Sequence, residues 1–152
     1  MAGEPGISEF ERGFPVEDPP VTLEWGIAED AALGLLAGAR VQRVVAGQVR
    51  LRCKALGGLD IEVNLHFKPR TSGRLKHLEM VRSPTRRRRK AFDDLQERLV
   101  SRLGAGVESK AGLFVPVEGI TPRSWVCGLV DVTHDYYFQG ALCEKVVFDW
   151  RG

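Results

Sequence analysis

The chain has 152 residues, a hydrophobic content of 43% and a formal net charge of +2 at pH 7. A chain of this kind can bury roughly 70% of its unfolded surface in one globular domain without disulfide bonds. Because it has no run of about 18 apolar residues and no N-terminal signal peptide, we expect a cytoplasmic protein without a membrane partner. The three cysteines form no C-x-x-C pair and are expected to be buried, reduced thiols.

Residues 1–24 form an acidic arm, which we separate from a single domain over residues 25–152. The arm has six acidic side chains and one basic one, with four prolines and three glycines that disfavour helix and strand. We therefore expect an extended arm or a disordered leader. Its apolar residues Phe10, Phe14 and Val16 leave a second possibility open, in which the arm docks onto the domain or onto a partner.

The domain is expected to begin with a short helix over residues 28–36. Glu29 and Asp30 would lie in its first turn, where the helix dipole favours acidic side chains, and Gly38 follows its end. A strand over residues 41–46 comes next and turns at Gly47.

Residues 49–67 predict a β-hairpin, because apolar and polar side chains alternate on both sides of a glycine pair. A three-residue loop over residues 56–58, with Gly58 in the left-handed region, keeps the apolar side chains on one face. This register pairs Cys53 with Ile61. On the polar face it places the following residues opposite each other: Arg52 and Glu62, Lys54 and Asp60.

A strand over residues 75–81 follows, and then a second helix with Ser83 as N-cap, Pro84 at its first position and Gly104 at its end. Further strands are expected over residues 113–117, 123–132 and 142–150. The predicted fold class is therefore α+β, an antiparallel β-meander sheet packed with two helices in the order helix, strands, helix, strands.

A run of five cations opens the second helix: Arg86, Arg87, Arg88, Arg89 and Lys90. It has three possible roles: a solvated overhang partly neutralised by Asp93 and Asp94, a contact for an acidic protein surface, or a site for nucleic acid. Nucleic acid is the less favoured partner, because no aromatic side chains are interleaved with the cations and the net charge is small.

Three consecutive aromatic residues, Tyr136, Tyr137 and Phe138, fall in a segment over residues 134–140 that we interpret as a hairpin connection. Such rings either pack in the core or form a tip that binds a protein, because Tyr and Phe anchor protein interfaces. Both interpretations stay open from the sequence.

His66 and His77 fall in strands that we expect to be neighbours, with Glu62 and Glu79 nearby, so a metal or acid–base site can be drawn on the open sheet face. An open face excludes water poorly, and the serines lack the G-x-S-x-G context of a nucleophile. The sequence therefore predicts no enzyme, no cofactor and no metal.

The segment Trp25-Gly26-Ile27-Ala28-Glu29, the glycine-rich hairpin, the strand that returns at Gly73 and the helix that ends at Leu103-Gly104 resemble small bacterial helix-plus-meander proteins. That group includes β-lactamase-inhibitor-like proteins and toxin-immunity proteins. The resemblance covers roughly residues 25–150 and implies a binding role, although the lipid-attachment cysteine of envelope relatives is missing.

The leading hypothesis is a non-enzymatic immunity protein, or inhibitor, that neutralises a partner protein such as a toxin with an acidic surface. Its partner-binding residues would be Arg86 to Lys90 and Tyr136 to Phe138. The alternative is a nucleic-acid-binding protein that uses the Arg86–Lys90 run.

Overall fold

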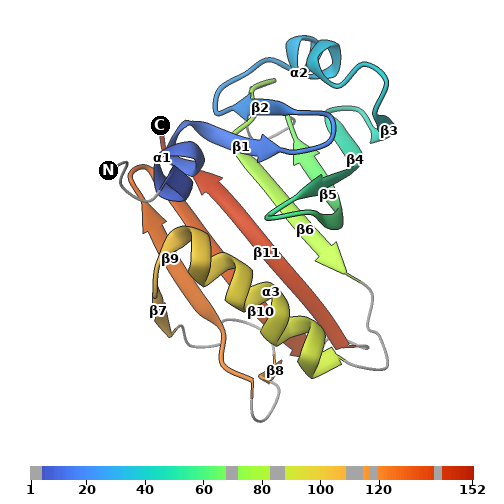
Figure 1. The fold of residues 1–152 in the computed structure, drawn as a ribbon. Helices are drawn as coiled ribbons and strands as arrows, with labels where there is room; N and C mark the ends of the chain where they lie inside the picture. The colour runs from blue at the N-terminus through green and yellow to red at the C-terminus, as the bar shows by residue number, and fades with distance from the viewer. Residues whose placement is uncertain (1–4, 68–71, 83–87, 109–114, 117–119, 139–141) are drawn as a thin grey trace.

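The computed structural model describes residues 5–67, 72–82, 88–108, 115–116, 120–138 and 142–152 (Figure 1). The helices are α1 (Pro5–Arg12), α2 (Glu29–Leu35) and α3 (Arg88–Leu103). The strands are β1 (Gly13–Val16), β2 (Val21–Glu24), β3 (Arg40–Val45), β4 (Gln48–Ala55), β5 (Leu59–His66), β6 (His77–Arg82), β7 (Val107–Glu108), β8 (Val115–Pro116), β9 (Arg123–Cys127), β10 (Val130–Phe138) and β11 (Leu142–Trp150).

One antiparallel sheet of nine strands dominates the described part of the chain. Its order is β3-β4-β5-β6-β11-β10-β9-β7, and β8 pairs with β10 beside this path. The pair β6–β11 joins two meanders that are far apart in sequence. Strands β1 and β2 form a separate hairpin. The predicted α+β class with an antiparallel sheet is confirmed.

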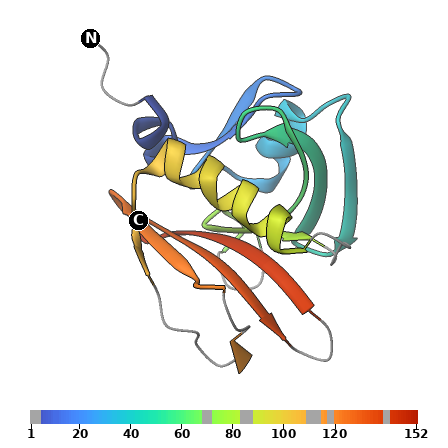
Figure 2. The ribbon, with the colours of Figure 1, turned by 60° about the horizontal axis from the view of Figure 1, so that its bottom comes forward.

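The two faces of the sheet differ in what covers them. Helix α3 crosses one face above β10 and β11, and α1 and the β1–β2 hairpin lie on the same side (Figures 1 and 2). The rings of Phe10 and Phe14 pack on Phe148 of β11, with centroid distances of 5.6 and 5.4 Å. Trp25 closes this part of the core by donating its indole N–H to the Phe10 carbonyl at 2.9 Å. We call the covered face inner and the opposite face outer.

The predicted element order was wrong at its start, because α1, β1 and β2 precede the first expected helix. Residues 5–24 are not an extended or disordered arm. Phe10, Phe14 and Val16 are all buried in the core shared with the sheet, which agrees with the docking alternative. The prolines are compatible with this structure: Pro5 occupies the first helical position of α1, where no N–H donor is needed.

The predicted hairpin register is confirmed at every position. Val49 pairs with Leu65 and Cys53 with Ile61, and the loop begins after the Ala55–Leu59 pair. Gly58 has φ +84° as expected, and Gly57 and Leu56 also have positive φ, at 83° and 54°. On the polar face Glu62 binds both Arg50 at 2.9 Å and Arg52 at 3.3 Å.

This strained loop is held by side chains from two distant elements. The Glu17 carboxylate accepts the backbone N–H groups of Gly58 at 2.6 Å and of Gly57 at 3.0 Å. Arg98 of α3 donates to the carbonyls of Leu56 and Gly57 at 2.9 and 2.7 Å. The loop therefore joins the N-terminal segment, the first meander and α3.

The other predicted boundaries have mixed outcomes. Helix α2 begins after Ala28 with Glu29 and Asp30 in its first turn, and α3 ends before Gly104, which has φ +90°. Ser83 and Pro84 lie outside the described residues. The single strand expected over residues 123–132 is two strands, since Gly128 and Leu129 form a turn between β9 and β10.

Candidate metal centre

Three potential metal ligands lie side by side on the outer face of the sheet, where β5 and β6 pair. His66 ends β5 and lies directly opposite His77, which begins β6. Glu79 comes two residues later on β6, and strand alternation therefore places it on the same face as His77. The sequence-based expectation that His66 and His77 occupy neighbouring strands is confirmed.

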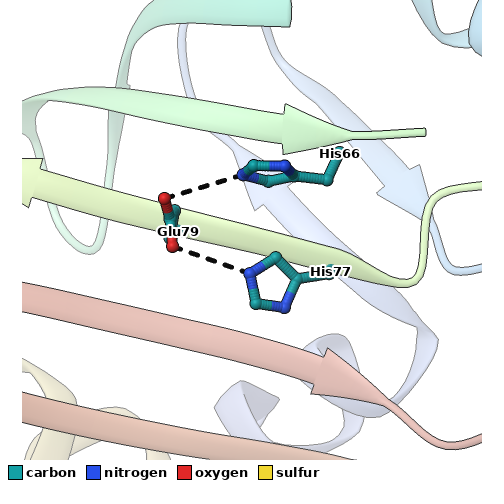
Figure 3. A group of neighbouring side chains, drawn as sticks. All are labelled: His66, His77 and Glu79. Carbon is teal, nitrogen blue, oxygen red and sulfur yellow. Dashed lines mark ion pairs between the residues drawn. The ribbon is translucent and has the colours of Figure 1, made fainter. Parts of the chain in front are cut away.

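The Glu79 carboxylate lies between the two imidazole rings, with one oxygen toward each (Figure 3). Its Oε1 is 3.6 Å from His66 Nε2, and its Oε2 is 3.6 Å from His77 Nε2. The two rings meet edge to face, with their centroids 5.0 Å apart and their planes at 73° to each other. One ligand atom from each of the three residues can be chosen so that all lie within 4.8 Å of one another.

A carboxylate on the next strand orients His77. Asp149 of β11 pairs with His77 in register, and its Oδ1 is 2.6 Å from His77 Nδ1. Asp149, followed by Glu79, raises the pKa of His77 to about 9, although burial acts in the opposite direction. His77 is therefore doubly protonated at neutral pH, and its Nε2 proton must leave before that nitrogen can bind a metal.

Glu79 is the least exposed member of the group, with 18% of its side chain accessible. His66 and then His77 hold the pKa of Glu79 well below its usual range, and the ammonium of Lys145 adds to this effect. Lys145 Nζ lies 3.0 Å from Glu79 Oε2. The carboxylate is thus ionised and surrounded by cationic or protonated nitrogen donors.

The arrangement fits a divalent transition-metal ion. Ligand atoms about 2.0–2.1 Å from a tetrahedral zinc ion are separated by about 3.4 Å, so the three ligand atoms, which lie within 4.8 Å of one another, would draw closer together around an ion. Two imidazoles and one carboxylate form a donor set that suits Zn²⁺ better than Ca²⁺ or Mg²⁺. Asp149 holds the other ring nitrogen of His77, as a carboxylate commonly does for a histidine that binds a metal.

The predicted basic run is only partly within the described residues. Arg86 and Arg87 lie outside them, and Arg88 and Arg89 contribute backbone to the first turn of α3. The exposed ammonium of Lys90 is 2.9 Å from Asp94 Oδ2, in agreement with the expected neutralisation by acidic residues four positions later. A role in binding a protein or nucleic acid stays a prediction.

The aromatic segment is not the hairpin connection that the sequence suggested, because β10 extends to Phe138. Tyr136 is 4% exposed and its ring packs edge-on against Phe92 of α3 at 5.6 Å. Tyr136 therefore belongs to the core. The prediction that it binds a partner from the protein surface was wrong, and the core-packing interpretation holds for this residue. The backbones of Tyr137 and Phe138 pair with both β11 and β8, and their side chains lie outside the described part.

A buried polar group was missed from the sequence. His134 of β10 is fully buried, and the ring of Phe92 stacks on its imidazole with the centroids 4.1 Å apart. Both ring nitrogens have polar partners. Its Nε2 lies 2.9 Å from Glu144 Oε2, and its Nδ1 lies 3.2 Å from Gln96 Oε1 of α3. In a strand, Tyr136 and His134 share one face, so the pattern of β10 is the signal that could have revealed it.

A hollow of about 840 Å³ lies away from the histidines, near the loop between β1 and β2. It is lined by charges of both signs, among them Asp18, Arg40 and Lys54, and by the buried thiol of Cys53. Desolvation raises the pKa of that thiol to about 12, so Cys53 is not a nucleophile at neutral pH.

Within the described ranges, each helix is too short or too polar to cross a membrane. Comparison of the chain with protein-family models, with curated proteins and with solved structures found no match.

Proposed function

We propose that this chain binds a divalent transition-metal ion of the zinc class through His66, His77 and Glu79. The observation that supports this most strongly is the convergence of three ligand atoms from two strands within 4.8 Å. The contact of His77 with Asp149 supports it further, because this bond fixes the ring with Nε2 toward Glu79.

The bound ion would have three protein ligands and a remaining position toward solvent. Catalytic zinc sites have the same number of ligands, but they lie in cavities from which water is excluded. His66, His77 and Asp149 are partly exposed on a sheet face. We therefore propose a metal-binding protein without enzymatic activity, in which the ion ties β5 to β6.

The test is calorimetric titration of Zn²⁺ into tag-free protein from which metals have been removed with a chelator. His66→Gln, His77→Gln and Glu79→Gln should each weaken binding at least tenfold. Asp149→Asn should weaken it about tenfold, because the carboxylate that orients His77 is lost. Zn²⁺ at 100 times its Kd should stabilise the wild-type fold by about 2.7 kcal/mol.

Matched controls exclude other donors. Glu62→Gln removes a carboxylate on the same face that is held by Arg50 and Arg52, and it should leave the Kd unchanged. Cys143→Ser removes the one thiol that is not fully buried, and it should also have no effect. Wild-type protein that binds no Zn²⁺, or whose Kd is the same in the three ligand variants, would overturn the proposal.

Recognition of a partner protein is a second candidate function, favoured by the exposed edge strand β3. Among the strands that the structure describes, β3 pairs with β4 alone and lies at the end of the sheet order, and Val44 and Val45 are 44% and 54% exposed. An extended segment of a partner could add to this edge. The immunity role, with a toxin as partner, belongs to this second proposal.

This candidate is tested by affinity capture from native lysate followed by mass spectrometry. The double variant Val44→Lys and Val45→Lys should lose a specific partner if β3 is the docking edge. Alanine substitution of Arg86 to Arg89 should lose it if the basic run is the contact, and binding should then depend on salt. Retention of the partner by both variants would exclude both surfaces.

A further inference from the structure

Lys145 occupies a position where it must interfere with any cation bound at Glu79. Its ammonium is 3.0 Å from Glu79 Oε2, and the same oxygen faces His77 Nε2 at 3.6 Å. A dication coordinated by this carboxylate would lie within a few ångströms of the ammonium, where like charges repel strongly even at the protein surface. Movement of Lys145 away from Glu79 would relieve this repulsion when a metal binds.

A second carboxylate is available to receive it. Lys145 is on β11, and its partner in the register with β10 is Asp135, which lies on the same outer face. Burial raises the pKa of Asp135, while the charges of His134 and Lys145 act in the opposite direction. Asp135 is thus a partly desolvated acid beside the lysine, and the flexible lysine stem can move its ammonium between two neighbouring carboxylates.

We propose that Lys145 is an exchangeable counterion of the metal centre, bound to Glu79 without metal and transferred to Asp135 when a divalent ion takes the Glu79 carboxylate. This inference rests on the proposed metal binding at His66, His77 and Glu79. Lys145 and Asp135 then set the affinity of that site, although neither is a metal ligand. The cost of displacing the ammonium lowers the affinity for every divalent ion, so only ions that bind two imidazoles strongly would be retained.

The exchange is tested by Zn²⁺ titrations of the chelator-treated full chain and four variants. Lys145→Gln removes the competitor and should tighten binding about tenfold. Asp135→Asn removes the receiving carboxylate and should weaken binding several-fold in the wild-type background. In the Lys145→Gln background the same Asp135→Asn change should have a much smaller effect, because no ammonium remains to be received. Lys145→Met serves as a second neutral variant if the glutamine does not fold.

Lys76→Gln is the matched control. Lys76 is also a lysine beside the cluster, but its ammonium lies over the ring of Trp150, 5.7 Å from the centroid. Its loss should leave the Zn²⁺ affinity within twofold of wild type. A change as large as that of Lys145→Gln would show a general effect of net charge and would overturn the exchange.

The outcomes separate the two proposals. If neither wild type nor Lys145→Gln binds Zn²⁺, the metal centre itself is wrong. If wild type binds through the three ligands but Lys145→Gln has the same Kd, the metal centre stands and the competitor role is overturned. If Asp135→Asn weakens binding equally in both backgrounds, Asp135 acts on the ion through its charge alone and the transfer step is overturned.

Discussion

His134 Nε2 lies 2.9 Å from Glu144 Oε2, and both side chains are buried between α3 and the sheet. Breaking a buried pair by removing one partner leaves an uncompensated polar or charged group. We expect Glu144→Ala to lower the free energy of unfolding by about 3–5 kcal/mol, measured by urea denaturation. Asp60→Ala, an exposed change on β5, should alter it by less than about 0.5 kcal/mol.

Replacing both members of this pair tests whether the polar groups themselves stabilise the fold. Replacing His134 by Leu together with Glu144 by Met should cost less than Glu144→Ala alone, because neither member of the pair is left buried without the other. A double variant that is less stable than the single one would show that Gln96 and the other neighbours depend on the contact between His134 and Glu144.

The contact of Glu17 with the loop at residues 56–58 makes part of the stability depend on pH. The N–H group of Gly58 lowers the pKa of Glu17 from 4.5 against the opposing effect of burial, and the N–H of Gly57 and the charges of Arg102 and Arg98 lower it further. A carboxylate with a lowered folded-state pKa stabilises the fold above its unfolded pKa and loses this contribution as pH falls through the folded value.

Glu17→Gln should therefore reduce the free energy of unfolding at pH 7 by about 1 kcal/mol, after allowance for solvent screening of this partly exposed side chain. The difference from wild type should shrink as the pH is lowered below 4.5. Urea titrations over this range measure it. A difference that stays constant with pH would show that the carboxylate contributes through shape and not through charge.

Two glycines that have open space around their α-carbons should respond to alanine with opposite signs. Gly58 has φ +84°, so Gly58→Ala adds only backbone strain and should destabilise the protein by about 1 kcal/mol. Gly34 lies inside α2 without a positive φ, so Gly34→Ala should stabilise it by about 0.5–1 kcal/mol. Thermal unfolding of the two variants beside wild type measures both, and the same sign for both would contradict the loop geometry.

The N-terminal segment should be required for folding. Phe14 is fully buried against Phe148, so Phe14→Ala should cost about 3–5 kcal/mol, whereas Glu9→Ala at an exposed site should cost little. Deletion of residues 1–24 should abolish the cooperative transition in circular dichroism. A deletion variant that unfolds as cooperatively as wild type would restore the view of these residues as a separate arm.

Local patterns predicted the first meander well, and long-range pairing accounts for most of what they missed. The hairpin register follows from alternation over residues 49–67, because a shift by one residue would place Leu51 or Val63 in solvent. Nothing local connects His77 with Asp149, which are joined only by the β6–β11 pair. The sequence therefore indicated His66, His77 and Glu79 but neither Asp149 nor Lys145.

The N-terminal and C-terminal errors have different physical causes. Prolines and acidic residues suggested disorder over residues 1–24, yet three large apolar side chains were enough to anchor the segment in the core. In the segment that begins at His134, consecutive aromatics were interpreted as a tip, although Tyr136 shares its strand face with buried Val132 and His134. Strand β10 continues to Phe138, inside the segment that was expected to turn.

The position of β11 between β6 and β10 also has a consequence for folding kinetics. Before β11 pairs with its neighbours, β6 and β10 each have an edge of unpaired backbone groups. Strand β6 would also expose the otherwise buried side chains of Leu78 and Met80. Closing this sheet requires contacts between residues that are widely separated in sequence, which slows folding. Truncation within β11 should therefore yield soluble product poorly, since two partly formed sheets would present complementary edges to other chains.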